Sequence, residues 1–344
     1  MTPEDSLLDE SVYYVVDQLA GGRPPAAAPP VSLLKPAPAA ERPPFWAGSP
    51  SNPGAAAHIG RRAPAYPPEP TGLPPASEAD FYASLLPDTV VDGATFGRAE
   101  VRAASVRGDS HRYADECRQD AVAVARIGEL ALLMVADGVG SQPFSHRGSN
   151  RICRLFARQV RDREPALRAY LAAGDETAFA GLVNRAVVEA AAGLAREAER
   201  QQMPPKAYST TMRALLVPID PDVRVRGFVS VGDGGLLRLR GGGWTSLDQA
   251  AGAAAMIDSA TDCLPTQYQH AHARLITDGL PGDVLVLCTD GFSLPLAGES
   301  EMRELLAEQW GGAVPGLADF LWQAQVRARS YDDDRTVVCL WEGR

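Results

Sequence analysis

The residues whose types and spacing could do chemistry are four aspartates that border apolar stretches. They are Asp120, Asp137, Asp290 and Asp333. Carboxylates that gather at one point cannot all ionise without a cation between them. Because these candidate ligands offer oxygen atoms only, they would favour Mg²⁺ or Mn²⁺ over Zn²⁺. Two such ions about 4 Å apart can hold a water as hydroxide and stabilise in-line attack on a phosphoester.

Each of these aspartates also has a simpler interpretation. An Asp that directly borders a strand is common in turns, and this would account for Asp120 and Asp137. Asp333 lies between Asp332 and Asp334 in the run YDDDRTVV, so it could belong to a solvated acidic turn. A single aspartate therefore indicates nothing by itself.

Strands that end at a common point must position the aspartates. The apolar run 130–136 ends at Asp137, and the run 284–288 ends just before Asp290, so both predict buried strands followed by sharp turns. Glycines predict a hairpin turn at Gly128 and another tight turn at 232–234. Further strands are expected at about 100–107, 121–127, 209–217, 223–231, 235–240, 272–277 and 335–341, and helices at about 147–162, 176–201, 299–309 and 314–328. Hairpins with paired helices between them indicate antiparallel sheets covered by helices, an α+β domain.

Composition bounds the possible functions. The 344 residues include 45% hydrophobic and 22% charged residues, which is typical of a soluble globular protein with an ample core. A net charge of −10 without a Lys/Arg block argues against a nucleic-acid partner. Five scattered cysteines without a CxxC pair indicate neither a zinc site nor a disulfide framework. With an acidic N-terminus unlike a secretory signal and no apolar run near the roughly 18 residues that span a membrane, we expect a cytoplasmic protein without membrane contact.

The N-terminal part differs in composition from the rest. Residues 1–20 predict a short helix over 5–19, which either packs on the domain or docks on a partner protein. Residues 21–78 are rich in Pro and Ala and predict a disordered linker, because they lack the apolar periodicity that would offset the entropy of ordering them. The folded domain is expected at 79–344.

Six short motifs in order resemble the metal-dependent protein phosphatases of the 2C type. They are QDAVAV, VADGVGS followed by GS at 148–149, STT at 209–211, VGD at 231–233, GDVLVLCTDG and DDRTVV, and they span roughly residues 100–342. The resemblance implies two antiparallel sheets packed face to face and flanked by helices, an αββα sandwich. It also implies hydrolysis of phosphoserine or phosphothreonine on proteins by a metal-bound hydroxide, without a covalent phosphoenzyme.

The resemblance assigns roles motif by motif. Asp137 would bridge two Mg²⁺ or Mn²⁺ ions, and Gly138 would lend its backbone carbonyl to one of them. Asp290 and Asp333 would ligate the first ion, and Asp120 would hold waters around the second. Asp333 is selected because it lies three residues before Thr336, as in the DNxT pattern of the family.

The sequence departs from the family pattern in several places. Gln119 stands where the family has Glu, DDRT replaces DNxT, VGDGG replaces VGDSR, and the link after the DG motif is about three residues longer. A phosphate-binding arginine is expected before the QDA motif, with Arg112 favoured over Arg107 and Arg118. His146 is a further candidate, as proton donor to the leaving group.

The resulting hypothesis is a monomeric phosphatase that acts on a phosphoprotein. The rival is an inactive pseudophosphatase that binds phosphoproteins as a regulatory module, motivated by Gln119, the altered loop and the N-terminal segment. Retention of all four aspartates argues against the rival, because an inactive site has no physical need to keep buried like charges together.

Overall fold

Two antiparallel sheets form the centre of the structure, a computed structural model that describes residues 58–59, 64–66, 80–248, 262–328 and 330–343. In spatial order, the five-stranded sheet contains β10 (His272–Ile276), β7 (Arg226–Val231), β6 (Met212–Pro218), β5 (Leu130–Ala136) and β4 (Ala121–Ile127). The six-stranded sheet contains β2 (Thr89–Phe96), β3 (Ala99–Val106), β13 (Arg335–Trp341), β11 (Val284–Cys288), β8 (Gly235–Arg240) and β9 (Gly243–Ser246).

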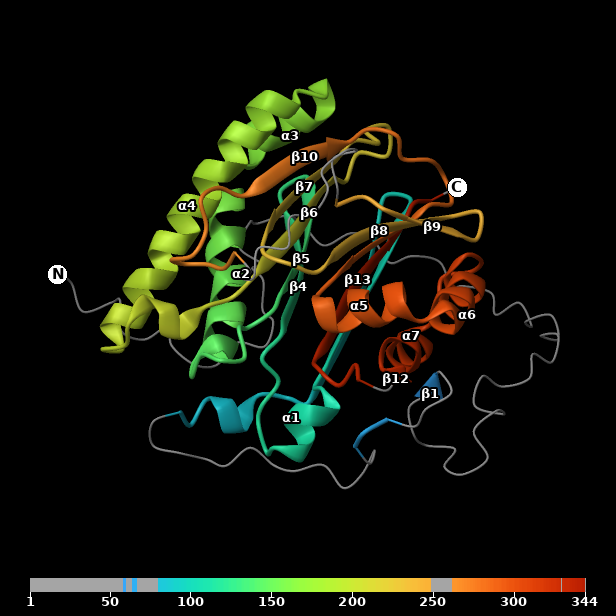
Figure 1. Ribbon diagram of the computed structural model, residues 1–344. Helices are drawn as coiled ribbons and strands as arrows, with labels where there is room; N and C mark the ends of the chain where they lie inside the picture. Colours follow the sequence, from blue (N-terminus) through green and yellow to red (C-terminus); the bar gives the residue numbers. More distant parts are fainter. Residues whose placement is uncertain (1–57, 60–63, 67–79, 249–261, 329, 344) are drawn as a thin grey trace, which may run out of the picture. The chain divides into compact units, whose positions relative to one another are not determined.

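Helices cover the outer face of each sheet (Figure 1). The five-stranded sheet carries α2 (Ser145–Arg161), α3 (Glu164–Ala173) and α4 (Glu176–Arg200), and the six-stranded sheet carries α5 (Asp290–Gly298), α6 (Ser300–Trp310) and α7 (Leu317–Ala324). Three short helices, α1 (Asp109–Tyr113), η3 (Ala83–Leu85) and η4 (Pro205–Tyr208), lie in the connections. The expected αββα sandwich is confirmed.

The side chains of β5 explain why its sequence is a continuous apolar run. Leu130, Leu132 and Met134 pack against the helices, whereas Leu133 and Val135 pack into the core between the two sheets. Because successive side chains of a strand point to opposite faces, a strand in the middle of a layered domain must be apolar on both. This strand and its turn at Gly128 lie where the sequence predicts them.

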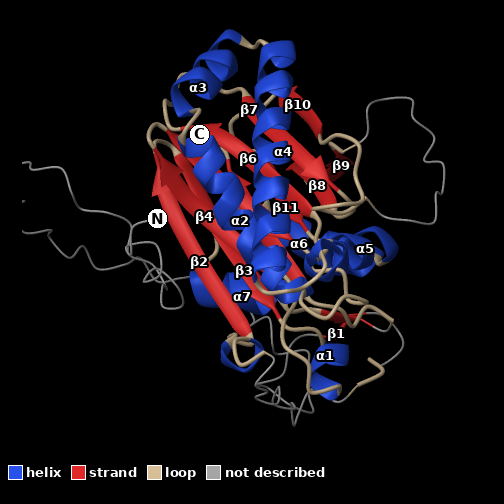
Figure 2. Ribbon diagram, turned by 90° about the vertical axis from the view of Figure 1, so that its left-hand side faces the viewer, coloured by secondary structure: helices blue, strands red, loops and turns tan. Residues whose placement is uncertain are grey.

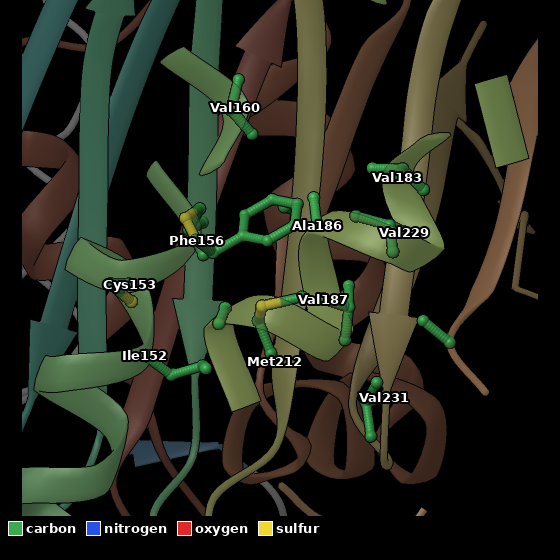
Figure 3. Close-up of a cluster of buried hydrophobic side chains, with 14 of the residues drawn as sticks. Ile152, Cys153, Phe156, Val160, Val183, Ala186, Val187, Met212, Val229 and Val231 are labelled. Atoms are coloured by element: carbon green, nitrogen blue, oxygen red, sulfur yellow. The ribbon is translucent and has the colours of Figure 1, made fainter. Parts of the chain in front are cut away.

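The helices α2 and α4 form the outer layer over the five-stranded sheet (Figure 2). Phe156 of α2 and Val187 of α4 are buried side chains in this layer, close to Met212 of the sheet (Figure 3). The Asp175 side chain caps α4 by accepting a hydrogen bond of 3.0 Å from the Ala178 amide. No membrane-spanning run is expected from the sequence, yet α4 is long and apolar enough to cross a membrane, judged by length and composition alone. One face of α4, however, is buried in this core.

Several elements were not expected from the sequence. The helix α3 and the strand β2 were missed, and α5 begins at Asp290, where only a turn was expected. The triple glycine 241–243 predicts a hairpin turn before Trp244, and the structure has this hairpin between β8 and β9. The turn at 232–234 joins β7 and β8, which belong to different sheets, so it is a crossover and not a hairpin turn. The chain thus passes between the two layers next to Asp233.

Two short pieces of the N-terminal region pack against the domain. The strand β1 (His58–Ile59) pairs in parallel with β12 (Arg327–Ala328), and Ile59 is buried among residues of the core that carries α5 to α7. Arg327 donates 2.6 Å to the carbonyl of Tyr66. The predicted helix over 5–19 lies outside the described residues, as does most of the predicted linker.

Candidate metal site

Asp120 and Asp137 are brought together by the hairpin of β4 and β5. In this antiparallel pair Ala121 lies opposite Ala136. Asp120 directly precedes β4 and Asp137 directly follows β5, so the register places the two aspartates opposite each other at one end of the five-stranded sheet.

Asp290 and Asp333 come to the same place from the six-stranded sheet. Cys288 of β11 pairs with Val337 of β13, and the Thr289 amide donates 3.0 Å to the carbonyl of Thr336. Asp290 therefore leaves the end of β11 next to the segment that leads into β13. Each sheet contributes one strand end and one strand start to the site.

Three of the four carboxyl groups, those of Asp120, Asp137 and Asp290, lie close together. Asp137 lies within hydrogen-bonding contact of both Asp120 and Asp290. Burial, followed by the neighbouring carboxylates, raises the pKa of Asp120 and of Asp137 well above the ordinary value. For Asp290, burial and then the charges of Asp233 and Asp333 raise the pKa to about 6. A cation among these oxygens would relieve this repulsion.

A hydrogen-bond network fixes Asp120. Thr289 donates 2.8 Å to Oδ2 of Asp120, and Arg118 donates 2.7 Å to the Asp120 carbonyl. Arg118 also donates 2.5 Å to Ser105, whose hydroxyl lies 2.6 Å from that of Thr336. Asp120 is only 1% exposed. These hydroxyl partners could not be predicted from the sequence, because single Ser and Thr residues in and beside strands are common.

Gly138 is placed to offer its backbone carbonyl. Gly138 forms a β-bridge with Thr210, and the residues beside them make its hydrogen bonds. The Val139 amide donates 3.0 Å to the Ser209 carbonyl, and the Thr211 amide donates 2.8 Å to the Asp137 carbonyl. No hydrogen bond to the Gly138 carbonyl is formed by the described residues. The position has no room for a side chain, because a Cβ there would lie 2.8 Å from the Ser145 carbonyl.

The donor set fits divalent cations that prefer oxygen. It consists of four mutually repelling carboxylates and one backbone carbonyl, and Mg²⁺ and Mn²⁺ prefer such ligands. The metal ligands expected from the sequence stay a prediction: Asp120, Asp137, Gly138, Asp290 and Asp333.

Comparison with known proteins identifies the family. The sequence model of protein phosphatase 2C matches residues 107–315, which is more than half of the chain. The chain belongs to the protein phosphatase 2C family. The matched range includes Asp120, Asp137 and Asp290, whereas Asp333 lies beyond it.

Solved structures of protein phosphatase 2C type share the fold. A bacterial serine phosphatase is 13% identical with a TM-score of 0.50, covering 70% of this chain and 96% of that chain. PppA, a regulatory component of T6SS in Pseudomonas aeruginosa, is 19% identical (TM-score 0.48; 73% and 99% covered). The catalytic domain of the phosphatase PstP, solved with two manganese ions, is 21% identical (TM-score 0.46; 73% and 98% covered). No curated protein sequence matches the chain.

Two glycines enclose the segment that carries Asp333 in this protein phosphatase 2C domain. A Cβ on Gly108 would lie 2.5 Å from the carbonyl of Asp332, and one on Gly291 would lie 2.0 Å from that of Asp334. Both contacts are with backbone atoms, which cannot turn away as a side chain can. The segment is therefore held between the start of α1 and the start of α5.

The arginines that precede the QDA motif already have protein partners. Arg112 donates 3.0 and 2.6 Å to the two carboxylate oxygens of Asp88, and Arg107 lies 3.4 Å from the same carboxylate. Arg118 is buried and engaged with the Asp120 carbonyl. A phosphate-binding role for Arg112 stays a prediction, and it requires the pair with Asp88 to open.

His146 lies in a separate cluster. Its Nε2 is 2.5 Å from Oδ2 of Asp80, and Arg147 donates 2.7 Å to the other oxygen of the same carboxylate. Burial alone would raise the pKa of Asp80, but its bonds to His146 and Arg147 lower it to about 2. The contact with Asp80 holds His146 at the start of α2, and its role as a proton donor stays a prediction.

Mn²⁺ binding is expected to weaken as the pH falls through about 6, the raised pKa of Asp290. A protonated carboxyl is a poor ligand, so protons compete with the cation and binding releases protons. Calorimetric titration with Mn²⁺ on either side of this pH, in buffers of different ionisation enthalpy, measures both effects. An affinity that does not change with pH would contradict the assignment of Asp290 as a ligand.

Proposed function

We propose that this chain is a metal-dependent serine/threonine protein phosphatase. The observation that carries the proposal is the convergence of Asp120, Asp137 and Asp290, with Asp333, from the ends of two facing sheets. Burial, followed by the charges of neighbouring carboxylates, raises the pKa of Asp120, Asp137 and Asp290, and a pair of divalent cations would reverse this shift. Membership of the protein phosphatase 2C family supports the same activity.

Two Mg²⁺ or Mn²⁺ ions would be held by these four aspartates and the carbonyl of Gly138. When bound, the ions supply positive charge that activates water and neutralises the phosphate. The chain itself orients the ligands. Thr289 holds the side chain of Asp120, and Arg118 holds its backbone carbonyl. Asp137 is positioned by β5, which it directly follows.

The proposed reaction is hydrolysis of a phosphoserine or phosphothreonine monoester. A water oxygen forms a bond to phosphorus while the bond from phosphorus to the Ser or Thr oxygen breaks. That oxygen takes up a proton and leaves as the free hydroxyl of the substrate protein, with inorganic phosphate as the second product.

Phosphate release from a phosphothreonine peptide by the full chain tests the proposal. Turnover is expected with Mn²⁺ and not with a chelator, and Asp290→Asn is expected to lower it about 100-fold or more, because a ligand contributes at least as much as its outer partners. Asp222→Asn is the matched control, since Asp222 is exposed in the turn before β7.

Two other outcomes are informative. Mn²⁺-dependent turnover that survives in Asp290→Asn would contradict the assigned site. Tight binding of the phosphopeptide without turnover, in a folded protein, would favour the regulatory binding module over the enzyme.

A further inference from the structure

Asp334 is a buried carboxylate beside the metal site, although it lies in an acidic run that resembles a solvated turn. It is 3% exposed. Its Oδ1 accepts 2.7 Å from the Gly108 amide and lies 2.9 Å from Nδ1 of His111. Its Oδ2 accepts 2.5 Å from the Gln119 amide and 3.2 Å from the Asp120 amide. One side chain thus joins residues 108–111 and 119–120 to a segment more than 200 positions further along the chain.

The hydrogen bonds exclude Asp334 as a metal ligand. His111, Asp333 and Asp334 offer ligand atoms within 4.8 Å of one another, as a cation site would. Each Asp334 oxygen, however, already faces two N–H donors. A cation at either oxygen would meet these hydrogens, so the arrangement suits an acceptor that organises backbone amides.

His111 is the side-chain donor to Asp334. Its Nδ1 lies 2.9 Å from Oδ1 of Asp334, the same oxygen that accepts from the Gly108 amide. Its Nε2 faces the carboxylates of Glu116 and Asp333 at 3.8 and 3.9 Å. The ring of His111 is therefore placed to hold the Asp334 carboxylate in position.

An amide in place of Asp334 could not make the same contacts. The DNxT pattern of the family has Asn at this position, but Asn offers one acceptor oxygen and an NH₂ group that is itself a donor. Whichever way it turned, that donor would face at least one backbone N–H. Only a carboxylate can accept from all four of these N–H donors.

We propose that His111 and Asp334 are a pair of positioning residues for the metal site. His111 holds the Asp334 carboxylate, and this carboxylate fixes the backbone at Asp120 and at Asp333, so that both ligands are in place before a cation arrives. The proposal deepens the proposed phosphatase function, because it names residues that act on the site through its ligands.

The test uses the full chain and the variants His111→Ala and His111→Asn, with His270→Ala as control. His270 is an exposed histidine before β10. The first readout is amide hydrogen exchange of Gln119 and Asp120 in metal-free protein, which does not depend on catalysis. The second is Mn²⁺ affinity by calorimetry, and the third is turnover at saturating Mn²⁺.

In the wild type, both amides are expected to exchange slowly without metal. His111→Ala is expected to speed their exchange and to weaken Mn²⁺ binding about 10- to 100-fold, with turnover recovered at saturating Mn²⁺. His111→Asn keeps a donor and is expected to restore both values, whereas Asp334→Asn should behave like His111→Ala. His270→Ala should match the wild type.

Each contrary result is decisive. Unprotected Gln119 and Asp120 amides in the wild type would overturn the proposal, even if His111→Ala did not fold. Faster exchange in His111→Ala with unchanged Mn²⁺ affinity would reduce the pair to a structural role. If the wild type bound no Mn²⁺, the phosphatase proposal would fail while the exchange experiment still tested the contacts of Asp334.

Discussion

Asp137→Asn is expected to abolish Mn²⁺ binding while leaving the metal-free protein folded and more stable at neutral pH. Asp137 contacts both Asp120 and Asp290, so its loss removes the central ligand of the site. Asn has nearly the same shape but carries no charge. The substitution therefore removes a buried repulsion that contributes nothing to folding.

The sign of the stability change follows from the raised pKa of Asp137. The folded protein holds this proton more tightly than the unfolded chain, whose ordinary value is 3.8. The free energy of unfolding therefore falls as the pH rises from about 4 through the folded pKa. Asn avoids this loss, and a gain of about 1 kcal/mol is expected at neutral pH, typical of a stabilising substitution.

Thermal unfolding with a chelator and calorimetry with Mn²⁺ measure the two effects of Asp137→Asn. Asp222→Asn again serves as the control, because Asp222 is exposed and far along the chain from the site. Retention of both Mn²⁺ sites in Asp137→Asn would show that Asp137 does not ligate. A lower melting temperature without metal would contradict the electrostatic argument.

Gly291→Ala is expected to be the most damaging single-methyl change near the site. Its Cβ would lie 2.0 Å from the backbone carbonyl of Asp334, so the start of α5 and the segment before β13 would have to separate. This separation moves Asp290 away from Asp333. A loss of about 1–3 kcal/mol in the free energy of unfolding is expected from the overlap, with Mn²⁺ affinity lowered about 100-fold.

Gly181→Ala is the matched control for Gly291→Ala. Gly181 lies within α4, and the nearest atom to an added Cβ is the end of the Arg185 side chain at 3.9 Å. Because Ala is a better helix former than Gly, a gain of about 0.5–1 kcal/mol is expected. If Gly291→Ala has the same free energy of unfolding and the same Mn²⁺ affinity as the control, the contact with Asp334 has no role in the site.

The positions of Asp120 and Asp137 could be predicted because they follow from local structure. A continuous apolar run with Gly128 before it predicts a hairpin, and a hairpin places the residues just outside its paired ends opposite each other. The strand β13 was also predictable, since RTVVCLW is apolar on both faces. Both predictions depend only on hydrophobic periodicity and turn-forming residues, which lie within a few positions of one another.

The role of Asp334 could not be predicted because it depends on residues more than 200 positions away. In the run DDD, the buried acceptor Asp334, the half-buried Asp332 and the exposed Asp333 have the same local sequence. The helix α5 was missed because Pro295 lies within it and its apolar spacing is irregular. β2 was missed because Asp92 and Gly93 interrupt its apolar pattern.

The place of β13 in its sheet sets when the candidate metal site can first be completed during synthesis. This strand lies between β3 and β11 and pairs with both, although β3 ends at Val106. Until the ribosome has released the chain through Trp341, β13 cannot pair with β3 and β11. Until then, no strand positions Asp333. A nascent chain that stops just before β13 therefore carries all four aspartates but leaves β3 and β11 each with one unpaired strand edge, and such edges invite association with other chains.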